Sequence, residues 1–203
     1  MNESASTTYR GLLVEIKYRT EAISAVLNKE VPLRAKIAEE LCYLQLRMIC
    51  ELIAIGCLVI HGSMKPKADL YTTHKADYII KNLSRLHPKF FPVPLEAEDI
   101  IEDGIPSWVH KTTGFLTQTD LVNLWNRHAG GALHRGHAKN ILENDRPLKF
   151  AEITGWRDKI IALLNRHIIA SPDEQTICYF IMNDGNNQVH SALFEQIELP
   201  SAR

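Results

Sequence analysis

The residues best suited to chemistry lie in one short run, Trp125 to His137, which carries several ionisable side chains around two glycines. Arg127 and His134 are seven positions apart. On a helix this spacing is close to two full turns, so both side chains would leave the same face, about 10 Å apart along the axis. Arginine binds phosphate oxygens in a fork, and histidine titrates near neutral pH as a general acid or base. The pattern therefore predicts metal-free chemistry on a phosphodiester attacked by a ribose 2′-hydroxyl.

Three neighbouring residues complete the predicted site. His128 directly follows Arg127 and is expected to support catalysis, while Arg135 and Lys139 are expected to bind phosphate. The histidines of this run match no known zinc-ligand spacing and have no cysteine nearby, so we expect neither a metal nor another cofactor. Two glycines in a helix cost roughly 2 kcal/mol relative to alanine. Gly130-Gly131 therefore predicts either a helix break or the close approach of another backbone.

A structural role is the alternative interpretation of the same side chains. Arg127 could be a surface or capping arginine near a helix end, and His134 a partly buried histidine bonded to the backbone. Arg47 and Glu51 are four positions apart, so on a helix they would form an internal ion pair. From a facing helix that pair could also orient His134 in a catalytic site.

The composition limits the class of protein. The chain has 203 residues and a net charge of −1 with neutral histidines, which argues against a protein that coats polyanions. Its hydrophobic content excludes disordered, collagen-like and disulfide-scaffold chains. The four cysteines include no CxxC pair, and the first ten residues lack a secretory signal pattern. We expect reduced thiols and a cytoplasmic location.

Helical periodicity dominates the first 170 residues, after an expected flexible tail over residues 1–8. The apolar window 41–60 has membrane-spanning length. It contains Arg47 and Glu51, which are expensive within a lone span and favour a buried helix and no membrane partner. Helices are expected at residues 9–28, 34–61, 69–86, 117–134 and 145–169, and Thr117 to Asp120 predict a capping box that opens the fourth of them.

Two segments depart from this periodicity. Residues 88–114 hold four prolines and a cluster of acidic residues, which predicts a long, solvated, Pro-rich loop. Residues 176–181 and 188–197 flank turn-forming residues and predict a C-terminal β-hairpin. The expected fold class is mainly α, a helical bundle of four to six helices with the Pro-rich loop and the hairpin. The expected domains are a bundle over 9–170 and a hairpin appendage over 171–203.

An arginine, a polar neighbour and a histidine a few positions later, set late in an antiparallel helical bundle, resemble the HEPN superfamily. In this chain the matching residues are Arg127, His128 and His134, and the resemblance covers about residues 35–170. It implies a helical, often dimeric protein of toxin or defence type that cleaves RNA without a metal. The site would then form across a symmetric homodimer, because isologous pairing doubles a sparse Arg/His pair.

A protein of another class fits the same residues. A non-catalytic helical interaction or regulatory protein would use them to bind a protein partner, a nucleotide or a phosphate, and the near-zero net charge mildly favours it. A positive pocket around Arg127, Arg135 and Lys139 would favour the ribonuclease. Placement of Arg127 and His134 on different faces would exclude it.

Overall fold

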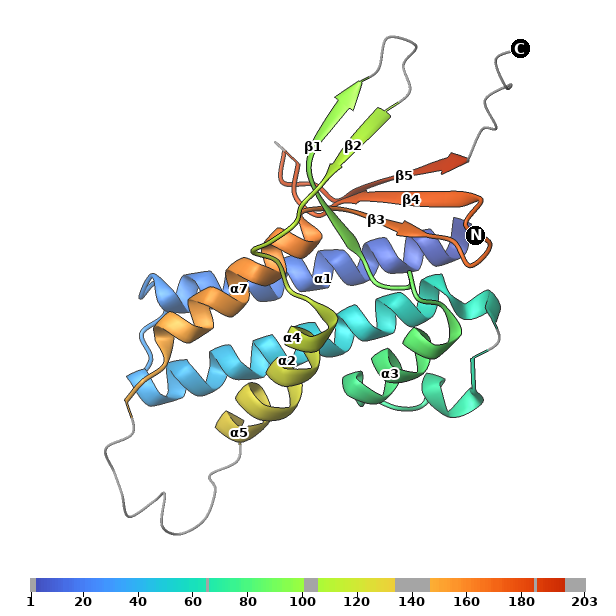
Figure 1. The fold of residues 1–203 in the computed structure, drawn as a ribbon. Coiled ribbons are helices and arrows are strands. Elements are labelled where there is room, and N and C mark those ends of the chain that lie inside the picture. The colour runs from blue at the N-terminus through green and yellow to red at the C-terminus, as the bar shows by residue number, and fades with distance from the viewer. Residues whose placement is uncertain (1–2, 65, 101–105, 134–146, 185, 196–203) are drawn as a thin grey trace, which may run out of the picture.

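Two long antiparallel helices form the base of the molecule in the computed structural model, which describes residues 3–64, 66–100, 106–133, 147–184 and 186–195. α1 spans Glu3–Leu27 and α2 spans Ala35–Ile60 (Figure 1). Their facing side chains, among them Leu13, Ile23 and Leu46, are fully buried. The predicted long central helix is confirmed. The expected flexible tail is wrong, because the first helix already begins at Glu3.

A five-stranded antiparallel sheet lies over one end of these helices (Figure 1). Its spatial order is β2-β1-β3-β4-β5. One face packs into the main core through Ile169, Cys178 and Phe180. The other face forms a separate apolar cluster that includes Ile168 and Tyr179. The strands are β1 (Val93–Ile100), β2 (Pro106–His110), β3 (Arg166–Ala170), β4 (Thr176–Ile181) and β5 (His190–Glu195).

The expected fold class, a mainly α bundle, is therefore wrong, because the chain is mixed α/β. The segment interpreted as a Pro-rich loop contains β1 and β2, which pair antiparallel. β1 also joins β3, with Pro94 opposite His167. The predicted C-terminal hairpin strands do pair, as β4 and β5, but β4 bonds β3 on its other side. They belong to the central sheet, so the expected boundary at residue 171 falls between two hydrogen-bonded strands.

The remaining helices pack beside α2. The predicted capping box is confirmed, because the Thr117 hydroxyl accepts from the Asp120 backbone N–H and the Asp120 carboxylate from that of Thr117. The helix expected over 145–169 is shorter, because it starts at Phe150 and gives way to β3 after Leu164. The bounds are α3 (Ala76–Leu86), α4 (Gln118–Asn123), a π-helix η3 (Leu124–Ala129), α5 (Gly130–Leu133) and α7 (Phe150–Leu164), with 3-10 turns η1 (Gly62–Met64) and η2 (Ala68–Tyr71).

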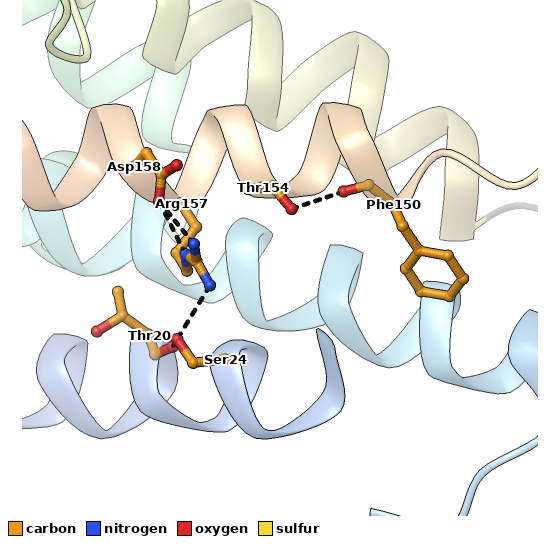
Figure 2. A network of polar contacts seen from close by, with 6 residues as sticks. All are labelled: Thr20, Ser24, Phe150, Thr154, Arg157 and Asp158. Carbon is orange, nitrogen blue, oxygen red and sulfur yellow. Dashed lines mark hydrogen bonds and ion pairs between the residues drawn. The ribbon is translucent and has the colours of Figure 1, made fainter. Parts of the chain in front are cut away.

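Polar contacts fix α7 across α1. Figure 2 shows Arg157 of α7 reaching down to α1, where its guanidinium donates to the Ser24 hydroxyl at 3.2 Å. The same guanidinium donates to Asp158 at 2.8 Å and 3.0 Å. Ser24 in turn donates to the Thr20 carbonyl of its own helix. This contact ties α7 to α1, and α7 carries a residue of the candidate site.

α2 is long and apolar enough to cross a membrane by length and composition alone. In this fold 61% of its most apolar window is buried inside the protein. The core helix of a soluble protein passes the same test, so the property is weak evidence for a span. The absence of a membrane partner stays a prediction.

Candidate functional site

A row of polar side chains follows one face of α2. Glu39, Tyr43, Arg47 and Glu51 recur every four residues, so they lie nearly above one another along the helix. This face is turned toward η3 and the start of α7, as its side-chain contacts below demonstrate. Such a row inside an apolar helix needs polar partners, because unpaired buried polar groups are costly.

The C-terminal end of the row, Arg47 and Glu51, contacts a tryptophan of η3. Arg47 Nε lies 3.4 Å from Glu51 Oε1, so the predicted ion pair is present. The Arg47 guanidinium also lies over the Trp125 ring, 4.6 Å from its centroid. The Trp125 indole N–H donates to Glu51 Oε1 at 2.9 Å. The three side chains thus fix η3 against α2. A π-helix inside a longer helix is rare, and many of those that occur lie at functional sites.

Tyr43, nearer the N-terminal end of the row, contacts a histidine–carboxylate pair. His128 Nδ1 lies 2.7 Å from Glu152 Oε1 of α7. The buried Tyr43 hydroxyl donates to the same oxygen at 2.8 Å. Lys149 Nζ lies 3.2 Å from Glu152 Oε2. Partial burial raises the pKa of Glu152, but the hydrogen bonds from Tyr43, His128 and Lys149 outweigh it, so the pKa is lowered from its ordinary value.

This geometry selects one tautomer of His128. An ionised carboxylate only accepts hydrogen bonds, so Nδ1 is the donor, and in the neutral ring Nε2 carries the lone pair. The His128 side chain is 32% exposed, and its ring lies 5.1 Å from that of Trp156. A carboxylate that orients an imidazole whose second nitrogen is available is the arrangement of an acid/base dyad.

Arg127 directly precedes His128 in η3. Its residue is exposed, whereas His128 is half-buried. No described residue forms a hydrogen bond or an ion pair with its guanidinium. It is therefore available to an anion from solvent. His134, Arg135 and Lys139 lie outside the described residues, so the predicted common face of Arg127 and His134 and the predicted positive pocket stay predictions.

The first of the two glycines has a packing reason. A Cβ at Gly130 would lie 3.2 Å from the Trp125 carbonyl oxygen and 3.6 Å from Arg47 Nη1. A Cβ at Gly131 would meet nothing within 4 Å. The helix does not break at the pair, because η3 ends at Ala129 and continues directly into α5 at Gly130. The expected close approach of another backbone is not found among the described residues either, because the tight contact at Gly130 is with a carbonyl oxygen of its own helix and Arg47 Nη1 lies at ordinary contact distance.

Sequence reasoning missed Tyr43, Glu152, Lys149 and Trp156 as members of this site. Tyr43 could have been found, because it stands four positions before Arg47 on the same helical face. The α7 residues carried no such signal, since only the tertiary fold brings Glu152 to His128. Among the described residues, no group of three or more His, Cys, Asp or Glu side chains is arranged to hold a metal.

A shallow cleft of about 510 Å³ lies elsewhere, between β1 and α7. Lys111, Asp158 and Arg166 are among its lining residues, and neither Arg127 nor His128 is. The candidate site is instead an open surface around the half-buried imidazole.

Comparison with protein-family models finds no match for this chain, and comparisons with curated proteins and with solved structures find none either. Membership of the HEPN superfamily stays a prediction.

Proposed function

We propose that this protein cleaves RNA without a metal and that His128 is its general acid/base. The observation that carries the proposal is the hydrogen bond of 2.7 Å between His128 Nδ1 and Glu152. It fixes the ring and leaves Nε2 for proton transfer. The hydroxyl of Tyr43 and the ammonium of Lys149 hold Glu152 in turn. Arg127, exposed and without a described partner, is the proposed phosphate-binding residue.

The proposed reaction follows from these groups. His128 Nε2 takes the proton of a ribose 2′-hydroxyl, and the 2′-oxygen bonds to the adjacent phosphorus. The bond from phosphorus to the 5′-oxygen breaks, and that oxygen takes a proton from the imidazolium or from water. The products are a 2′,3′-cyclic phosphate and a 5′-hydroxyl. Arg127 neutralises the phosphate oxygens while charge builds on them.

The test is cleavage of mixed RNA by the purified protein in excess EDTA. A positioned general base contributes about 10²- to 10⁴-fold, so His128→Ala should lose at least a hundredfold in rate. Glu152→Gln should lose less and shift the pH profile, because Nδ1 no longer faces a charge. Arg127→Ala should weaken substrate binding.

His190→Ala is the matched control. His190 Nε2 also pairs with a carboxylate, that of Asp184, at 2.7 Å, but on the edge strand β5. Its loss should leave cleavage unchanged. Wild-type activity in a folded His128→Ala variant would refute the assignment. Absence of cleavage by folded wild-type protein would refute the nuclease and favour the non-catalytic phosphate-binding or interaction protein.

A further inference from the structure

An apolar stripe on α2 has no covering element among the described residues. Ile37 is 48% exposed and Leu44 is 41% exposed, both unusual for large aliphatic side chains of a central helix. Leu41 and Met48 are partly exposed on the same face. These four residues, called the α2 stripe below, are spaced four, three and four positions apart. This is the alternation of a two-helix coiled-coil seam.

The two borders of the α2 stripe are already occupied. On one side Arg19 of α1 donates to Gln45 at 2.8 Å. On the other side Arg47 lies over Trp125 of η3. The stripe is thus a surface between α1 and the candidate site, long enough for one further helix. A contiguous exposed apolar strip of this kind marks an interaction surface.

We propose that a second copy of this chain covers the α2 stripe, with the two α2 helices antiparallel about a two-fold axis. The α2 stripe is self-complementary. In the antiparallel register centred between Leu41 and Leu44, Leu41 lies opposite Leu44 of the partner subunit. Ile37 then lies opposite Met48 of the partner subunit. In each of these two pairs an apolar side chain at one seam position meets an apolar side chain at the other seam position of the partner helix, as antiparallel helix pairs require.

The charges flanking the stripe agree with the same register. Glu40 and Arg47 are one heptad apart, so they lie on the same flank of the seam. The two-fold axis brings Glu40 close to Arg47 of the partner subunit. The same axis brings Arg47 close to Glu40 of the partner subunit. A parallel pairing would instead set Glu40 toward Gln45 of the partner subunit, so it would form no such ion pair. Charge complementarity therefore favours the antiparallel homodimer.

Mass in solution tests the dimer. Light scattering at tens of micromolar should give twice the chain mass of 23.1 kDa. Leu44→Glu should give the monomer mass, because two carboxylates would enter the seam. Tyr18→Glu is the matched control, since Tyr18 is a 63% exposed side chain in the middle of α1, and it should remain dimeric. A wild-type monomer at 100 µM, or a dimer that survives Leu44→Glu, would overturn the proposal.

Cross-linking tests the register. The native cysteines are buried, so a short bismaleimide should react chiefly with introduced ones. A mixture of Ile37→Cys and Met48→Cys chains should cross-link, whereas Ile37→Cys alone should not, because its two copies lie about 16 Å apart along the axes. Cross-linking of Ile37→Cys with itself would mean another arrangement. Glu40→Arg should weaken the dimer at least tenfold at low salt and less at high salt.

The inference does not rest on the proposed function. Cleavage and mass are separate measurements, so an inactive dimer would refute only the nuclease and an active monomer only the dimer.

Discussion

Gly56 of α2 allows a test of how closely the two long helices pack. A Cβ at this position would lie 2.7 Å from Cε2 and 2.9 Å from Cδ2 of the Tyr9 ring on α1. The ring cannot move aside, because it packs against Phe180 at 4.5 Å between centroids and its hydroxyl bonds His167 at 2.9 Å. Gly56→Ala therefore forces the helices apart or displaces a ring from a closed site.

The magnitude follows from two opposing effects. Alanine gains about 1 kcal/mol over glycine in a helix interior. Overpacking a core by one methyl group costs about 1–3 kcal/mol. We therefore expect Gly56→Ala to lower the free energy of unfolding by about 1 kcal/mol. Gly155→Ala on α7 is the matched control, since a Cβ there meets nothing within 4 Å, and should raise it by about 1 kcal/mol.

Urea unfolding followed by far-ultraviolet circular dichroism measures both variants against the wild type. The two identical substitutions should move the midpoint in opposite directions, with unchanged slopes. If Gly56→Ala stabilises the protein as much as Gly155→Ala does, the close contact between α1 and α2 at Tyr9 is refuted.

Three further predictions concern the sheet, the caps and the site. Burial lowers the pKa of His167 from its ordinary 6.5 to about 4, so the unfolded state takes up the proton first as the pH falls. Stability should therefore decline from pH 6.5 to pH 4, by at most about 1.4 kcal/mol per pH unit from this group, and equal urea midpoints at pH 7 and pH 5 would contradict this. Thr117→Ala removes the capping box with Asp120 and should cost about 1 kcal/mol in thermal unfolding, whereas an unchanged Tm would mean that the cap contributes nothing. Trp125→Phe removes the indole donor to Glu51 and should lower stability by about 1–3 kcal/mol in urea, and a neutral result would show that Glu51 finds another donor.

Local chemistry made part of this fold predictable. The apolar period of α2 and the Thr117–Asp120 cap depend on neighbours in sequence, and both were predicted. The strands β1 and β3 were missed for physical reasons. Ile168 continues the helical spacing of Ile160 and Leu164, so periodicity alone cannot show where α7 ends. Pro92 directly before β1 and Pro94 within it argue against a strand until the partners of β1 are known.

The candidate site divides in the same way. The sequence does single out Arg127, His128 and the Arg47–Glu51 pair, because ionisable residues are uncommon in apolar or glycine-rich surroundings. Glu152 could not, because a glutamate in the first turn of a helix is ordinary. Only the three-dimensional fold shows that it orients an imidazole. The carboxylate partner of a histidine is set by tertiary contact and leaves no trace in local spacing.

The faces of α2 connect the two proposals. One face is buried against α1, a second carries the polar row that meets η3 and α7, and the third is the exposed α2 stripe. Arg47 stands at the border of the second and third faces, where it contacts Trp125 and would meet Glu40 of the partner subunit. Glu51 and Trp125 already hold Arg47 within one chain, and Trp125 lies in the same π-helix as His128. The geometry of the His128–Glu152 dyad therefore does not depend on the partner subunit, so Leu44→Glu, which touches no residue of the dyad, should give a monomer with unchanged cleavage activity.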